Sequence, residues 1–196
     1  EKTEEPKEKR ERRSLYFDIV DNDDLKDKSE GYPIRQKIRL RFYTFEDQHI
    51  KLELKGKRDQ YMVKETASIS REDALLWASG RVQSFLHASN PVLRKIAVLM
   101  TRKVYRPVTV VDYCRSAYIL PLQNIRITLD SNLRASPITD LFNPHLPTVP
   151  IAAPHTLVLE VKFNRFLPQW LSCLLQDRPA IRCAISKYSY ARTLNT

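Results

Sequence analysis

The chain has 196 residues, of which 42% are hydrophobic, and this is enough for one domain with a sizeable core. Its 33 Lys and Arg residues outnumber 23 Asp and Glu residues, so the formal net charge at pH 7 is +10. Such an excess favours an anionic partner, such as a phosphate compound, a nucleic acid or a membrane surface. Three cysteines without paired spacing argue against a disulfide framework or a zinc site.

Apolar stretches such as Ile96 to Met100 fall far short of the roughly 20 residues that a membrane helix needs. No signal peptide opens the sequence. We therefore expect a cytoplasmic domain that does not itself insert into a membrane.

The first 13 residues, Glu1 to Arg13, are almost all charged and have no apolar period, which predicts a solvated tail. Three later segments alternate between apolar and polar residues, which is the period of a strand with two different faces. These segments are Gln36 to Phe42, Ile50 to Lys57 and Tyr61 to Ile69. In the first of them Lys37, Arg39 and Arg41 share one face, so the pattern predicts antiparallel strands with a cationic side.

Helical spacing follows from Ser70 to about residue 100 and is interrupted at Asn90 and Pro91, which predicts a helical insertion between strands. Extended segments then return, separated by a Pro-rich loop at residues 136–154. They are Arg106 to Ile119, Asn124 to Asp130 and Thr156 to Phe163. An apolar-striped segment from Phe166 to Leu175 predicts a short helix near the end.

The cationic face has two interpretations. It can be the solvated side of an antiparallel sheet, or it can line the inside of a barrel of about eight strands whose apolar face packs on helices. Single carboxylates among the cations, Glu53, Asp130 and Glu160, favour the second. In a basic cavity these carboxylates would hold Mg²⁺ or Mn²⁺, with Glu160 as the first candidate. Alternatively, Glu53 and Glu160 form internal ion pairs with neighbouring lysines.

Seven segments, in order along the chain, also match a known family. They are SLYFD at 14–18, KIRLRFY at 37–43, KLELK at 51–55, VDYCRSAY at 111–118, IRITLDSNLRAS at 125–136, LEVKF at 159–163 and SKY at 186–188. Through them the chain resembles the polyphosphate polymerase domain of the vacuolar transporter chaperone (VTC) family, within the CYTH-like triphosphate tunnel metalloenzymes.

The resemblance implies an α+β fold in which an antiparallel β-barrel of about eight strands forms a triphosphate tunnel, with helices packed outside. Residues 14–196 would form this single domain, with the helical insertion at about 70–100. The family begins with a further strand that bears a Glu and Lys-Tyr signature, and the segment ahead of SLYFD contains no such strand. The first barrel strand is therefore expected to be missing.

The resemblance also implies roles for individual residues. The catalytic phosphate contacts would be Arg39, Arg41, Lys55, Arg115, Arg126 and Lys187. Lys64 and Lys162 would be further substrate contacts, and Tyr113 would share a face with Arg115. Tyr113 either hydrogen-bonds phosphate or closes a layer of the barrel. The metal, Mn²⁺ or Mg²⁺, would be held by Glu160, with Glu53 as a second candidate.

The implied activity is transfer of the terminal phosphoryl group of ATP onto a growing polyphosphate chain. Two alternatives are a hydrolase of triphosphate or nucleoside triphosphates in the same tunnel, and a non-catalytic module that binds polyphosphate. We expect no nucleic-acid partner, because the stacking platform of single-strand binders is not evident. ATP and polyphosphate would be the partners, with a membrane or regulatory partner outside these residues.

Overall fold

The computed structural model of the chain describes residues 7–59, 61–121, 124–177 and 180–193. The strands are β1 (Lys7–Asp18), β2 (Ile34–Phe42), β3 (His49–Arg58), β4 (Tyr61–Ser70), β5 (Arg106–Leu120), β6 (Ile125–Ser136), β7 (Val149–Pro150) and β8 (Val158–Lys162). The helices are α1 (Asp23–Ser29), α2 (Arg71–Ala78), α3 (Pro91–Lys103), α4 (Gln169–Gln176) and α5 (Lys187–Thr193), with a 3₁₀ turn η1 (Gln83–Phe85). The predicted α+β class with eight antiparallel strands is confirmed.

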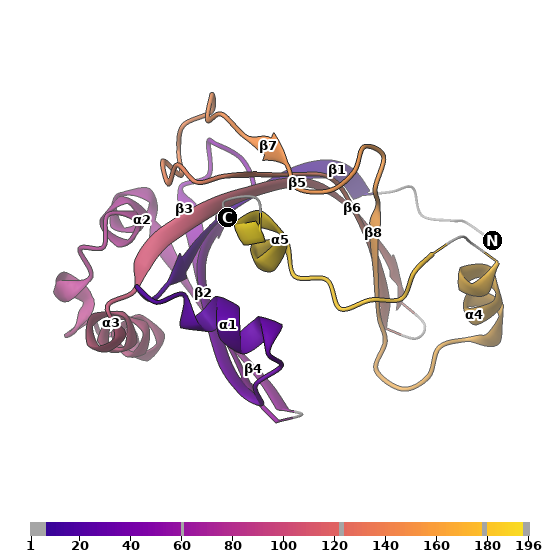
Figure 1. The fold of residues 1–196 in the computed structure, drawn as a ribbon, viewed down its shortest axis with the longest axis horizontal. Coiled ribbons are helices and arrows are strands. Elements are labelled where there is room, and N and C mark those ends of the chain that lie inside the picture. The colour runs from indigo at the N-terminus through magenta and orange to yellow at the C-terminus, as the bar shows by residue number, and fades with distance from the viewer. Residues whose placement is uncertain (1–6, 60, 122–123, 178–179, 194–196) are drawn as a thin grey trace.

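The sheet is open and arched, where the sequence predicted a closed barrel. Its strands follow the order β4-β3-β2-β1-β5-β6-β7, and β8 pairs with the other half of the long strand β6. Among the described residues no ladder joins the two edge strands β4 and β8. The arch nevertheless brings both edges toward one concave side, where α5 also lies (Figure 1).

The convex face of the arch carries the main core, because the two-residue period of the strands sends their apolar side chains there. Ile38, Leu40 and Leu52 are fully buried in this core. Trp77 of α2 and Ile96 of α3 cover them from outside. Each large apolar side chain removed from water in this way stabilises the fold by about 1.5–3 kcal/mol. The cationic residues of the same strands must therefore face the concave side.

The helices α2 and α3 lie where the sequence predicts helical spacing. The hydroxyl of Ser70 accepts a hydrogen bond from the Asp73 backbone N–H at 3.0 Å and caps α2. Asn90 caps α3 through its bond from the Val92 N–H at 2.9 Å, and Pro91 occupies the first turn. By contrast, α4 lies apart from the sheet (Figure 1), and its Trp170 is exposed.

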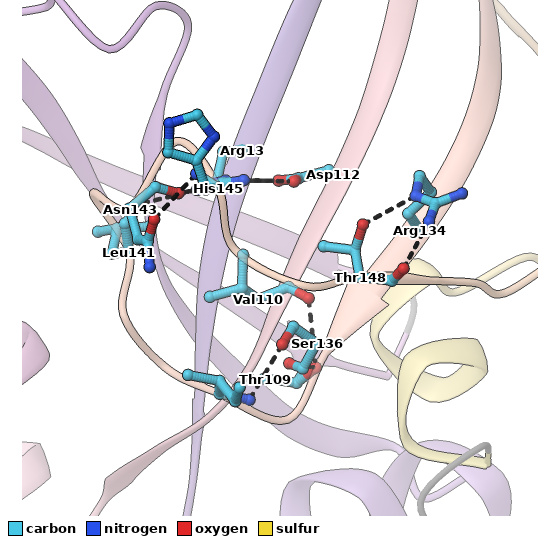
Figure 2. A network of polar contacts seen from close by, with 11 residues as sticks. Arg13, Thr109, Val110, Asp112, Arg134, Ser136, Leu141, Asn143, His145 and Thr148 are labelled. Atoms are coloured by element: carbon cyan, nitrogen blue, oxygen red, sulfur yellow. Dashed lines mark hydrogen bonds and ion pairs between the residues drawn. The ribbon is translucent and has the colours of Figure 1, made fainter.

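Residues 7–13, which the charge pattern assigned to a solvated tail, instead form the first half of β1. Figure 2 shows how the sheet accommodates this charge. Arg13 is buried and makes a bidentate ion pair with Asp112 of β5, with Nη2 2.7 Å from Oδ2. It also donates to the carbonyls of Leu141 and Asn143, which ties the loop after β6 to the sheet. Charge thus stabilises this strand. Residues 1–6 of the predicted tail lie outside the described residues.

Candidate functional site

A cavity of about 570 Å³ opens on the concave side of the sheet. Thirteen of its lining residues are Lys or Arg, against three acidic residues, which are Asp24, Glu53 and Glu160. All eleven residues that the sequence proposed for the site line it: Arg39, Arg41, Glu53, Lys55, Lys64, Tyr113, Arg115, Arg126, Glu160, Lys162 and Lys187. They come from β2, β3, β4, β5, β6, β8 and the start of α5.

One wall of the cavity is organised by Glu53, whose side chain is only 1% exposed. Arg39, directly opposite on β2, donates to its carboxylate with Nε 2.8 Å from Oε2. Arg41 pairs with the other oxygen, and the Lys64 Nζ lies 3.0 Å from it. Burial alone would raise the pKa of Glu53, but the charges of Arg39 and Arg41 lower it below its ordinary value. Glu53, a predicted metal ligand, thus holds three cations in place.

The facing wall is organised in the same way by Asp130, which is also 1% exposed. Arg115, its partner across the β5–β6 ladder, donates in bidentate fashion at 2.5 and 2.7 Å. The Nζ of Lys187, from α5, lies 2.5 Å from the Asp130 Oδ2 and 4.7 Å from the centroid of the Tyr113 ring. Burial alone would raise the pKa of Asp130, but the hydrogen bonds from Arg115 and Lys187 lower it.

Aromatic side chains form the floor between the two walls. The Tyr16 hydroxyl accepts a hydrogen bond from Arg39 Nη1 at 3.1 Å. Its ring lies 5.3 Å from that of Tyr188, and the Lys37 ammonium lies over both rings, at 5.6 and 5.1 Å. Burial would raise the pKa of Tyr16, but Arg39 and Lys37 lower it below its ordinary value. Lys37, held over this floor, therefore adds a further positive charge to the cavity.

Several cations of the cavity have no carboxylate partner. Within the described ranges, Lys55 and Arg126 make no ion pair. The pKa of Lys55 is lowered, first by partial burial between the walls and then by the charges of Arg39 and Lys162, although its end remains accessible to water. Cations crowded in this way repel one another, so an anion that entered the cavity would be stabilised by all of them.

Glu160 is the carboxylate of the cavity that remains accessible, with 45% of its side chain exposed. Lys162 Nζ lies 3.3 Å away and Arg115 Nη2 3.9 Å away. Within the described part of the chain, no group of three or more His, Cys, Asp or Glu side chains is placed to hold a metal ion. A single open carboxylate fits the Mg²⁺ or Mn²⁺ site that takes its remaining oxygens from substrate phosphates and water.

A second cavity, of about 830 Å³, shares Arg12, Tyr43 and Tyr113 with the first. Arg12 lies on β1, in the segment expected to be a tail, and was not predicted as a site residue. The two-residue period that places Tyr16 on the concave face also places Arg12 there. Extending that period upstream would have identified it.

The fold and the cavity define an α+β domain with a strongly cationic cavity. A profile of the VTC domain matches residues 1–194, and the chain belongs to that family. Within residues 7–59, 61–121, 124–177 and 180–193, no helix is both long and apolar enough to cross a membrane.

Two solved structures share part of this arrangement. A Bacillus halodurans protein described as a proposed adenylate cyclase has a TM-score of 0.47 and 13% identity, over 86% of this chain and 72% of its own. The PH1819 protein of Pyrococcus horikoshii OT3 has a TM-score of 0.37 and 17% identity, over 67% of this chain and 60% of its own. No curated protein matches the chain. Because both TM-scores are below 0.5, these similarities do not indicate a function. We therefore infer the function from the residues of the cavity.

Proposed function

We propose that the chain is an ATP-dependent polyphosphate phosphotransferase of the polyphosphate kinase type. The observation that carries this proposal is the composition of the cavity, where thirteen Lys and Arg side chains surround three carboxylates. A triphosphate or polyphosphate chain is an elongated anion with several charges and would compensate many of these cations at once. The family match supports the same class of substrate.

The two walls would bind the phosphates in fixed geometry. Glu53 holds Arg39, Arg41 and Lys64, and Asp130 holds Arg115 and Lys187, so these cations are ordered before a ligand arrives. Donors that are already oriented stabilise charge without reorganisation during the reaction. Phosphoryl transfer depends mainly on such positioning and charge stabilisation. We propose Glu53 as the residue that positions the cations of its wall.

In the reaction, a terminal oxygen of the polyphosphate chain attacks the γ-phosphorus of ATP. A new P–O bond forms to the chain, the bond between the γ-phosphorus and its bridging oxygen breaks, and ADP leaves. The unpaired cations Lys55 and Arg126, with Lys162 near Glu160, would neutralise charge on the transferred group and on the chain. No protein nucleophile is required, because the acceptor is itself a phosphate oxygen.

Glu160 would hold the Mn²⁺ or Mg²⁺ ion. When bound, the ion would neutralise phosphate charge and orient the phosphate oxygens. Glu53 is a poorer candidate, because its side chain is only 1% exposed and three cationic side chains already hold its carboxylate. The cytoplasmic location and a membrane or regulatory partner outside these residues remain proposals.

The test is incubation of the purified protein with ATP and MnCl₂, with polyphosphate detected on stained gels and free phosphate measured in parallel. We expect long anionic chains from the wild type, and none from Glu160→Ala. Glu46→Ala, an exposed carboxylate in the β2–β3 turn, is the matched control and should keep the activity. Free phosphate without chains would identify a hydrolase. Binding of polyphosphate without either product would identify a binding module.

A further inference from the structure

Two residues of the matched segments do not themselves line the cavity, yet the structure joins them. Asp18 ends the SLYFD segment on β1, and Tyr188 ends the SKY segment on α5. Both side chains are buried, and the Tyr188 hydroxyl donates a hydrogen bond to the Asp18 carboxylate. Asp18 also accepts from the backbone N–H groups of Asp24 and Leu25, at 3.1 and 3.2 Å. One carboxylate therefore joins β1, the first turn of α1 and α5.

Helix α5 is anchored on both sides of this contact. At its start, the Ser186 hydroxyl accepts from Lys37 Nζ at 3.1 Å and from the Ser189 N–H at 3.3 Å. At its end, Arg192 Nη2 donates to Asn22 Oδ1 at 2.7 Å. A helix of seven residues is not stable by itself in water, so these anchors fix it against the concave face of the sheet (Figure 1).

Lys187 is the residue of α5 that enters the cavity. It lies between Ser186 and Tyr188, and thus between two anchored side chains. A lysine has a flexible four-carbon stem that loses considerable rotamer freedom when it is held in one place. The position of its ammonium beside Asp130 and over Tyr113 therefore depends on where the backbone of α5 is fixed.

We propose that Asp18 and Tyr188 are positioning residues that fix α5 so that Lys187 contacts the bound phosphate chain. This inference rests on the proposed function, because it assigns a ligand contact to Lys187. Removing the Tyr188 hydroxyl leaves the backbone donors of α1 on Asp18 and the ring contact with Tyr16, but it breaks the hydrogen bond that joins α5 to Asp18 of β1. Its main effect is then a weaker contribution of Lys187 to phosphate binding.

The experiment is a double-mutant cycle in which tripolyphosphate binding is measured by titration calorimetry for Tyr188→Phe, Lys187→Gln and the double variant. We expect Tyr188→Phe to weaken binding roughly five- to tenfold, which corresponds to the net contribution of one ordinary hydrogen bond. In the Lys187→Gln background the same change should have less than about a twofold effect, because the positioned group is gone. The matched control is Tyr190→Phe, which removes the hydroxyl of an exposed tyrosine of α5 that does not line the cavity. Its binding should equal that of the wild type.

Equal weakening by Tyr188→Phe in both backgrounds would overturn the proposal, because it would indicate a general structural effect. No weakening in the wild-type background would overturn it as well. If Lys187→Gln binds like the wild type, Lys187 has no ligand contact and the proposal fails, although the cavity can still bind phosphate. If the wild type does not bind tripolyphosphate at all, the proposed function itself fails. If Tyr188→Phe does not fold, the same cycle with Arg192→Gln applies, with the same expected coupling to Lys187.

Discussion

The two walls of the cavity use one physical device but differ in how they are built. Each places a carboxylate that is 1% exposed beneath cations that point into the cavity. The Glu53 wall comes from three consecutive strands, so the register of two hairpins is enough to form it. The Asp130 wall takes Arg115 from the neighbouring strand but Lys187 from the C-terminal helix α5. The first wall is local in the chain, whereas the second requires α5 to dock.

Glu53 holds three cations and Asp130 holds two, so we expect the largest loss of stability when Glu53 is replaced. In Glu53→Gln, Arg39, Arg41 and Lys64 lose their common counter-charge within a partly desolvated wall. We expect a loss of about 3–5 kcal/mol in the free energy of unfolding. Urea denaturation without phosphate measures it, and tripolyphosphate should restore part of the stability. Glu46→Gln is the control, and a loss below about 1 kcal/mol in Glu53→Gln would contradict the account.

Asp130→Asn should have a smaller effect, since two cations depend on this carboxylate. We expect about 2–3 kcal/mol. Adding Lys187→Gln should recover part of this loss, because one uncompensated charge is then removed. The same urea measurements on the single and double variants test this. A double variant less stable than Asp130→Asn alone would show that Lys187 stabilises the wall by other contacts.

Acid should weaken both walls. The pKa values of Glu53 and Asp130 are both held below their ordinary range by the cations beside them. A carboxylate with a depressed pKa in the folded state contributes stability above its unfolded pKa, and loses it as the pH falls through the folded pKa. Stability should therefore decline below about pH 4, by up to about 1.4 kcal/mol per pH unit and group.

In Glu53→Gln and Asp130→Asn this decline should be shallower than in the wild type, which unfolding at pH 4, 3.5 and 3 would measure. Asp24, whose pKa burial raises to about 7, is present in all three proteins and contributes equally to their slopes. If the free energy of unfolding changes equally with pH in all three proteins, the pKa values of Glu53 and Asp130 are not lowered by their cationic partners, and the account is contradicted.

The same difference between local and distant contacts explains which site residues could be predicted from the sequence pattern and which could not. The faces of β2 and β3 follow from a two-residue period, so the pattern alone placed Arg39 beside Arg41 and Glu53 among the cations. The resemblance then gave roles to these residues and to Lys55. Lys187 was assigned by resemblance, since no period relates it to Asp130. The anchors of α5 were missed for the same reason, because Asp18 and Tyr188 meet only after the chain has folded.

Two further differences have identifiable causes. The charged residues 7–13 were assigned to a tail because composition does not show that Arg13 has a buried partner in Asp112. Strand periodicity does not specify the open sheet, because closure depends on whether the edge strands β4 and β8 pair with each other, and no ladder joins them among the described residues.

The most direct test of the central claim, that the concave cavity binds a phosphate chain, is titration of the protein with tripolyphosphate. Lys55→Gln is the informative variant, because Lys55 faces the cavity and makes no ion pair with another described residue that its loss would disturb. Arg102→Gln removes the same charge from the exposed outer helix α3. We predict roughly tenfold weaker binding for Lys55→Gln and less than about a twofold change for Arg102→Gln. Equal weakening in the two variants, or no binding by the wild type, would contradict the account.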